Sequence, residues 1–388
     1  MQLNTAEIQD YIARGLIKAI TVDTSIFDRA GLRLESGVLG QLHALGPTKL
    51  RFVLQEIVYE ELAEHMRQDA ADSIRAARKA LSNVSGYWSP VPSEMAKTAA
   101  FVQAVADDGR AQADDRLRLF LMGVRASIVP TKKFVDIDAV IKAYFARLPP
   151  FGAAKKKEEF PDALALSSLE NWAQAERTIV LAVSADGDWA EFCAKSPNLA
   201  VVDNLATALA CSQSKMARDL AEALGQEVQR GSNPAFLSDL GSALDRQSAE
   251  ISVDESYDSL FYGDAEIWVD NVSLDEGVLV NYPLEFEPLS YENEELVVGA
   301  TVPCQISVSG SISFSIKDSI DRDWVPMGST SVEAVESESL AVVITVSIRR
   351  GEPWAIKKVD VEPKRVVIEF GHVQPDWIRE QGPEDDEG

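Results

Sequence analysis

The chain has 388 residues, of which 46% are hydrophobic and 26% are charged, and no apolar run approaches the roughly 18 residues of a membrane-spanning helix, so we expect no membrane segment. The formal net charge of −25 argues against a nucleic-acid partner. The charge is uneven, however: residues 251–388 carry 9 Lys and Arg against 29 Asp and Glu, whereas residues 1–250 carry 28 against 33, which weakens that objection.

The cysteines and the first residues bear on the cellular compartment. Cys193, Cys211 and Cys304 are odd in number and far apart, which favours a reducing compartment over a disulfide framework or a zinc site. The first residues lack the basic flank and apolar core of a signal peptide. We therefore expect a cytoplasmic protein.

The first part of the chain alternates short apolar runs with helical patterns. Asn4, with Glu7 three positions on, predicts a capped helix start. The apolar runs are typical of parallel strands that are buried on both faces. The expected strands are 19–23, 49–54, 178–184 and 199–202, and the expected helices are 5–15, 32–45, 56–81, 161–176 and 189–195. This alternation predicts an α/β domain with a parallel sheet flanked by helices, over residues 1–204.

Residues 64–150 form an expected helical insert in this domain. The pattern predicts helices over 94–106, 112–125 and 136–147. Beyond residue 204 we expect a helical linker over 205–250, an acidic, antiparallel all-β domain of sandwich type over 251–376, and an acidic tail over 377–388. The strands expected in the β domain are 267–269, 277–282, 295–302, 305–316, 340–348 and 365–370.

Carboxylates occur where the expected strands end and helices begin. Asp23 ends the first strand, Glu61 lies early in the helix after the second, and Asp162 opens a later helix. Asp186 and Asp188 follow the strand 178–184. Because ligands collect beyond the carboxyl ends of parallel strands, we expect these acids to converge. Converging carboxylates repel one another unless cations neutralise them, and Mg²⁺ suits oxygen ligands. Such ions can activate water and stabilise the leaving oxygen of a phosphodiester.

The order of these acids, with the elements between them, resembles PIN-domain nucleases over residues 18–205. The matching segments are Val22-Asp23-Thr24-Ser25, Val58-Tyr59-Glu60-Glu61-Leu62, Asp162-Ala163-Leu164 and Ser184-Ala185-Asp186-Gly187-Asp188. The chain is similar to the longer bacterial subgroup that has a helical insert and a C-terminal extension. The resemblance implies that Asp23, Glu61, Asp162 and Asp186 bind Mg²⁺ or Mn²⁺, with Asp188 as a further carboxylate. It also implies that Thr24 or Ser25, and Ser184, orient ligands or water.

Several alternatives stay open at these positions. Ser25 stands where the family commonly has Asn, and Glu56 and Glu60 compete with Glu61 for the place of the second acid. Each acid also has a structural interpretation without chemistry. Asp23 is then a helix cap, Glu61 part of a solvated helix face, Asp162 a stabiliser of a helix start, and residues 186–188 an ordinary turn.

A basic run, Lys155-Lys156-Lys157, lies shortly before Asp162. It is either a solvated loop or a contact to substrate phosphates, and in the second case affinity falls with salt. His43, His65 and His372 form no cluster in the sequence, and there is no Gly-rich phosphate loop. The acidic C-terminal region has no EF-hand spacing, so calcium binding there is a weaker hypothesis.

The function predicted from these features is a metal-dependent endoribonuclease that hydrolyses phosphodiester bonds without a covalent intermediate. RNA rather than DNA follows from the resemblance alone. We also expect a toxin or defence role, with the acidic β domain restraining the nuclease or binding a protein partner, and a homo-oligomer stays open. The alternatives are a structure-specific DNA nuclease and a non-catalytic protein-interaction subunit with a vestigial site.

Overall fold

The structure is a computed structural model, and it describes residues 3–46, 48, 50–86, 93–151, 159–318, 323–349 and 352–380. The chain divides into two compact units, Met1–Ser214 and Lys215–Gly388. No helix in these described ranges is long and apolar enough to cross a membrane.

The first unit is built on a parallel sheet of five strands in the order β3-β2-β1-β4-β5. The strands are β1 (Ile17–Val22), β2 (Arg51–Gln55), β3 (Ser127–Val129), β4 (Ile179–Val183) and β5 (Leu199–Val202). All four pairings are parallel, and Val22 pairs with Val183. Because β1 and β4 are central, nearly all of their residues are buried, which explains their apolar sequences. The carboxyl ends of the strands meet at one edge, as the sequence predicts.

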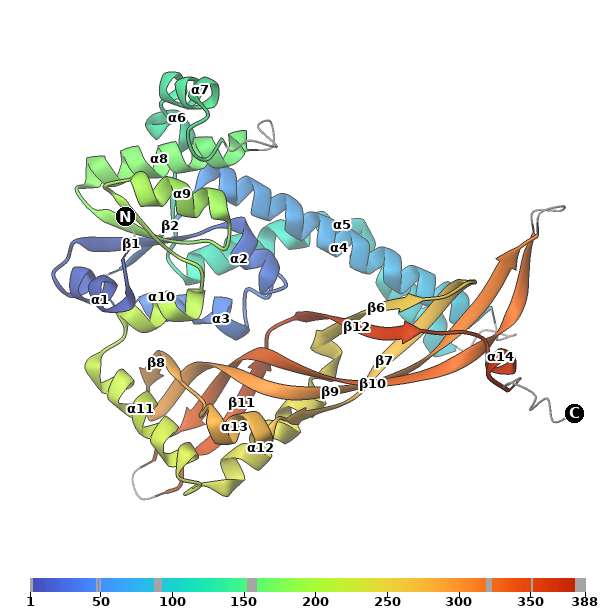
Figure 1. Cartoon of the computed structure of the whole chain (residues 1–388). Helices are drawn as coiled ribbons and strands as arrows, with labels where there is room; N and C mark the ends of the chain where they lie inside the picture. Colours follow the sequence, from blue (N-terminus) through green and yellow to red (C-terminus); the bar gives the residue numbers. More distant parts are fainter. Residues whose placement is uncertain are drawn as a thin grey trace, which may run out of the picture. The chain divides into compact units, whose positions relative to one another are not determined.

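Helices cover both faces of this sheet, with α8 and α9 on one face and α1 and α10 on the other (Figure 1). The capping box predicted at Asn4 and Glu7 is present at the start of α1. The helices of the unit are α1 (Thr5–Ala13), α2 (Thr24–Arg29), α3 (Gly37–Gly40), η1 (Gln41–Leu45), α4 (Glu56–Ser85), α5 (Ser93–Gly123), α6 (Thr131–Phe134), α7 (Ile137–Ala146), α8 (Phe160–Glu176), α9 (Gly187–Lys195) and α10 (Leu205–Ser212). The parallel α/β fold predicted from the alternating pattern is confirmed.

The insert differs from the prediction in two respects. The helices expected over 94–106 and 112–125 are one continuous helix, α5. The expected all-helical insert also contains β3, which pairs with β2 and forms an edge of the sheet. The helix expected over 32–45 is shorter and begins at Gly37.

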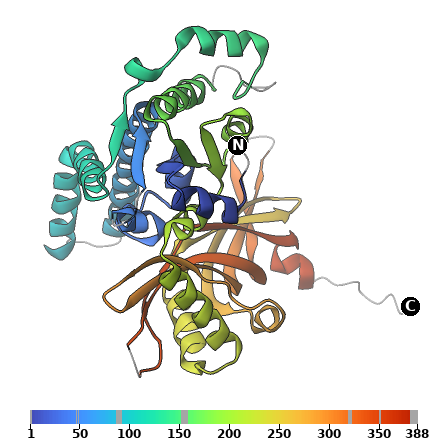
Figure 2. The ribbon, with the colours of Figure 1, turned by 90° about the vertical axis from the view of Figure 1, so that its left-hand side faces the viewer.

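The α4–α5 pair projects to one side of the sheet, and the end of α5 returns to the body of the unit (Figures 1 and 2). Phe120 of α5 packs edge-on against Phe27 of α2, with ring centroids 6.4 Å apart. Arg116 donates to both carboxylate oxygens of Glu35, with its Nε 2.8 and 3.1 Å from them. This ion pair lowers the pKa of Glu35, chiefly through the hydrogen bond from Arg116. The insert is therefore fixed next to α2, the helix that begins at Asp23.

The second unit combines helices with a mostly antiparallel sheet. Strands β7 (Tyr262–Leu274), β8 (Glu287–Glu292), β9 (Glu295–Lys317), β10 (Trp324–Ser347) and β11 (Ala355–Val361) form that sheet, and β6 (Ile251–Asp258) pairs in parallel with β12 (Lys364–His372). Two helices, α11 (Lys215–Gln229) and α12 (Pro234–Arg246), share the core of the strands through Leu224, Phe236 and Leu240. Two short α-helices, α13 (Glu276–Asn281) and α14 (Asp376–Glu380), and the 3-10 helix η2 (Ser248–Glu250) complete the unit.

Several details of this unit differ from the prediction. The strand expected over 277–282 is helix α13, and the strands expected over 295–302 and 305–316 are one strand, β9. The helices of residues 205–250 are divided: α10 belongs to the first unit, whereas α11 and α12 pack in the second. The layer that shares the core of the antiparallel sheet consists of these helices and the β6–β12 pair rather than a second antiparallel sheet.

Candidate metal centre at the carboxyl edge of the parallel sheet

Asp23 lies at the point where β1 gives way to α2. Its backbone N–H donates to the carbonyl of Val183 on the neighbouring strand, at 2.9 Å, which fixes it at the sheet edge. Its Oδ1 accepts the N–H of Thr24 and so caps α2. Its Oδ2 accepts the hydroxyl groups of Ser25, at 2.5 Å, and of Ser184, at 2.9 Å. Asp23 is therefore a helix cap, but its second oxygen joins the ends of β1 and β4.

Glu61 lies in the second turn of α4 and points toward the start of α2. Its Oε2 accepts the hydroxyl of Thr24 at 3.0 Å. Of the two competing acids, Glu60 is exposed, and Glu56 faces away, since its Oε2 accepts the N–H of Thr131 at 2.7 Å. The structure therefore brings Glu61, and neither of the other two, next to Asp23.

Asp162 lies in the first turn of α8, immediately after Pro161, the second residue of the helix. The indole Nε1 of Trp189, on α9, donates to its Oδ1 at 2.9 Å. Trp189 is fully buried, so the position of the indole is fixed by packing. The buried indole of Trp189 therefore orients the carboxylate of Asp162.

Asp186 and Asp188 begin α9, directly beyond β4. Asp186 caps the helix, because its Oδ1 accepts the N–H of Asp188 at 2.7 Å. The N–H of Asp186 in turn donates to the hydroxyl of Ser184 at 3.1 Å. Ser184 therefore connects Asp186 with Asp23. Residues 186–188 can therefore form the turn that begins α9 and also contribute acids to the site.

The pKa values show that these acids lie within each other's electric field. Burial raises the pKa of Asp162 to about 6, and repulsion from Asp23, Glu61 and Asp186 adds to the rise. Burial is also the main cause of the raised pKa of Asp23 and of Glu61. The influences that lower these pKa values are neutral hydrogen bonds, except for the charge of His65 near Glu61. Among the residues that the structure describes, little positive charge therefore balances these acids.

The donor set suits a hard divalent cation. Within the described ranges, no Lys or Arg pairs with Asp23, Glu61, Asp162 or Asp186. In the same ranges, Oε1 of Glu61 and the Oδ2 atoms of Asp162 and Asp186 accept no hydrogen bond. These oxygens are available as ligands, and carboxylate oxygen is what Mg²⁺ and Mn²⁺ prefer.

The side chains do not by themselves form a closed cage. In the part of the chain that the structure describes, no group of three or more His, Cys, Asp or Glu side chains is placed to hold one ion. Mg²⁺ usually binds one or two carboxylates and keeps several waters, so an incomplete protein cage fits its chemistry. That Asp23, Glu61, Asp162 and Asp186 bind Mg²⁺ or Mn²⁺ therefore stays a prediction.

One acid near the site, Glu159, was not predicted from the sequence. Glu159 precedes α8, its Oε2 is buried without a hydrogen-bond partner among the described residues, and it raises the pKa of Asp188 after burial and Asp186. Its place three residues before Asp162 was the available signal. The predicted phosphate contacts Lys155, Lys156 and Lys157 lie outside the described residues.

Comparison with known proteins gives one result for this region. Residues 20–189 match the model of the PIN domain family. This range begins in β1 and ends at Trp189, so it contains Asp23, Glu61, Asp162, Asp186 and Asp188. Searches of curated proteins and of solved structures gave no match.

Proposed function

Because the chain carries a PIN domain over residues 20–189, we propose that it is a metal-dependent endoribonuclease. PIN domains are generally nucleases that use divalent metal ions. The observation that supports an intact site is the convergence of Asp23, Glu61, Asp162 and Asp186 without a Lys or Arg partner among the described residues. A vestigial site has no physical reason to keep several partly buried carboxylates that repel one another.

The four acids would hold Mg²⁺ or Mn²⁺, with Asp188 as a further carboxylate near the site. Asp23 is the central ligand in this proposal, since Thr24, Ser25 and Ser184 hold its two oxygens in place. Thr24 also orients Glu61, and Trp189 orients Asp162. When bound, the ion supplies charge for a nucleophilic water and for the leaving oxygen of a phosphodiester.

The basic run Lys155-Lys156-Lys157 is proposed to contact substrate phosphates. Its support is its position in the chain, a few residues before Asp162. Each phosphate contact that is lost should lower the slope of log affinity against log salt by about 0.7 on single-stranded nucleic acid. Binding of single-stranded RNA by Asp23→Asn, with and without replacement of the three lysines by alanine, measures this slope.

The acidic C-terminal unit is proposed to restrain the nuclease or bind a basic protein partner, as in a toxin or defence effector. Its support is the charge of residues 251–388, with 9 Lys and Arg against 29 Asp and Glu. Such a surface repels RNA and attracts basic surfaces. A chain that ends after Ser214 should then cleave RNA faster than the full chain, once its circular dichroism confirms folding. Equal rates would remove this part of the proposal.

The substrate is tested by comparing single-stranded RNA, single-stranded DNA and a flapped DNA duplex at equal Mg²⁺ or Mn²⁺. Endonucleolytic cleavage of RNA alone is expected. Cleavage confined to the flapped duplex would support the structure-specific DNA nuclease instead. No cleavage of any of the three, with either metal, would support a non-catalytic interaction subunit.

A further inference from the structure

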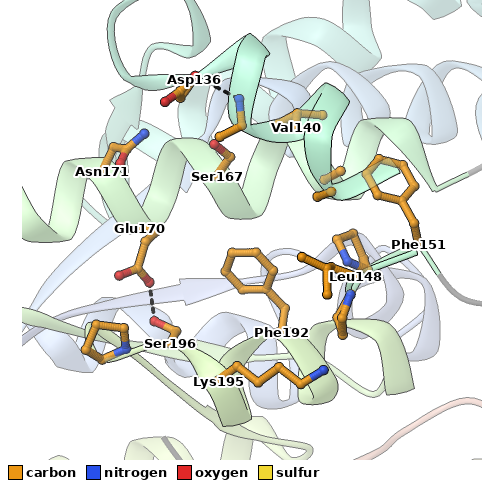
Figure 3. A pocket seen from close by; sticks show the side chains of 16 residues that line it. Asp136, Val140, Leu148, Phe151, Ser167, Glu170, Asn171, Phe192, Lys195 and Ser196 are labelled. Atoms are coloured by element: carbon orange, nitrogen blue, oxygen red, sulfur yellow. Dashed lines mark hydrogen bonds between the residues drawn. The ribbon is translucent and has the colours of Figure 1, made fainter. Parts of the chain in front are cut away.

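A pocket of about 410 Å³ opens between α7, α8 and α9 of the first unit (Figure 3). Its volume is within the usual range of ligand sites, about 300–1,000 Å³. Its walls are mainly apolar and include Val140, Leu148, Phe151 and Phe192. The side chain of Phe192 lies between the α8 and α9 ribbons (Figure 3).

The pocket and the acidic site share two helices, α8 and α9. Ala163 of its lining follows Asp162, and Phe192 lies on the same face of α9 as Asp188, four residues on. Four residues of α-helix correspond to about 6 Å along the axis. A nucleic-acid strand held at the acidic site would reach this pocket by following α8 and α9 for one to two helical turns.

The polar groups of the pocket suit the edge of a flat, hydrogen-bonding ligand. Asn171 uses its Nδ2 to donate to the carbonyl of Phe134, at 2.7 Å, whereas its Oδ1 accepts no hydrogen bond from any described residue. Ser167 also has no hydrogen-bond partner within the described ranges. These two groups remain available to a ligand.

The rim of the pocket is held in place and carries one positive charge. Both oxygens of Glu170 are used, one by the hydroxyl of Ser196 and the other by Nδ2 of Asn198, at 2.6 Å, and this fixes the loop after α9. Lys195 is exposed at the mouth and pairs with no acid among the described residues. An ammonium group at this place suits the phosphate of the nucleotide that enters.

We propose that this pocket binds a nucleobase of the substrate strand, close to the bond that is cleaved, and so sets a base preference. The inference rests on the proposed nuclease function. Phe192 stacks on the base, Asn171 and Ser167 bond its edge, and Lys195 binds a neighbouring phosphate. Aromatic stacking accepts every base, so the preference comes from the two polar groups.

The test uses the full chain in EDTA, titrated calorimetrically with each ribonucleoside 5′-monophosphate and with ribose 5-phosphate as the control without a base. Two variants change the pocket differently: Phe192→Ala removes the ring, and Ala139→Phe fills the mouth from an exposed lining position. Phe145→Ala is the matched control, since Phe145 is 77% exposed on the same helix as Ala139 and outside the lining. Stacking of about 1–3 kcal/mol corresponds to affinity that is about 5- to 150-fold weaker in both variants.

A second assay records which bases flank the bonds cut in random-sequence RNA. We expect Phe192→Ala and Ala139→Phe to lose nucleotide binding or base preference, and Phe145→Ala to keep both. If Phe192→Ala and Ala139→Phe behave like the wild type in both assays, the pocket does not bind a base and the proposal is wrong. If RNA is still cleaved in that case, the proposed nuclease function is unaffected. If nucleotide binding depends on Phe192 but no RNA is cleaved, the nuclease function is wrong, whereas the pocket remains a nucleotide-binding site.

Discussion

The indole of Trp189 and the carboxylate of Asp162 are joined by a hydrogen bond of 2.9 Å between two helices, α9 and α8. Trp189 is fully buried and Asp162 is partly buried, so the bond holds a charged group at the boundary between core and solvent. This bond lowers the pKa of Asp162, but burial outweighs it and raises that pKa to about 6. The fold thus keeps one acid of the site in an unfavourable environment.

Replacing Trp189 with phenylalanine keeps an aromatic side chain and removes the donor. Because the bond to Trp189 favours the charged carboxylate, Trp189→Phe should raise the pKa of Asp162 further above 6 in metal-free protein. Loss of the bond and of some buried volume should lower the free energy of unfolding by about 1–3 kcal/mol. Carbon-13 NMR of the Asp162 carboxyl against pH measures the shift. An unchanged or lower pKa would contradict the role given to this bond.

Asp162→Asn should make the metal-free protein more stable at pH 7. The pKa of Asp162 is about 6 in the folded chain against an ordinary value of 3.8, so the folded state binds the proton more tightly. The protonated Asp162 carboxyl therefore makes its full contribution to the free energy of unfolding below about pH 4, and this contribution is lost as the pH rises through about 6. At pH 7, Asp162→Asn should raise the free energy of unfolding by at most about 3 kcal/mol, at 1.36 kcal/mol per pKa unit. The increase should be smaller than this limit, because solvent screens this partly exposed group.

Thermal unfolding in EDTA at several pH values measures this difference between Asp162→Asn and the wild type. It should disappear near pH 3 and grow between pH 4 and 6. Addition of Mg²⁺ should stabilise the wild type more than the variant, because only the wild type keeps the full charge. A stability difference that is independent of pH would show that the pKa of Asp162 is not raised in the folded protein.

Glu61 and Glu60 form a natural matched pair. Glu61 accepts the hydroxyl of Thr24, whereas Glu60 is exposed on the same helix. Glu61→Gln should lower metal-dependent cleavage by about 10²- to 10⁴-fold, on the scale of lost catalytic groups. Glu60→Gln should leave the rate unchanged. Equal losses in both variants, at matched thermal stability, would mean that the second acid of the site lies elsewhere.

The sequence was most informative where a strand is buried and a polar residue ends it. Val22 and Val183 are buried and pair in the sheet, so Asp23 and Ser184 follow them at one edge, as the apolar runs predicted. The place of Glu61 among three neighbouring acids needed the orientation of α4. The Trp189–Asp162 bond joins residues 27 positions apart and depends on how α8 packs on α9, which no local pattern specifies.

The predicted elements that differ from the structure do so for local reasons. The pattern predicted two helices with a gap between residues 106 and 112, but α5 continues through Gly109, since one glycine in a helix costs only about 1 kcal/mol. The apolar run in 277–282 suits a short strand and a helix equally well, and tertiary packing selects helix α13. Strand β3 spans only Ser127–Val129, so no alternation was available to reveal it.

The most direct test of the shared carboxylate site is Mg²⁺- or Mn²⁺-dependent cleavage of single-stranded RNA by the wild type, Asp23→Asn and Asp186→Asn. Asp138→Asn serves as control, because Asp138 is an exposed acid of α7 outside the cluster. We expect the wild type and Asp138→Asn to cleave at equal rates, and both site variants to lose at least about 10²-fold in rate. Full activity in Asp23→Asn and Asp186→Asn would contradict this expectation.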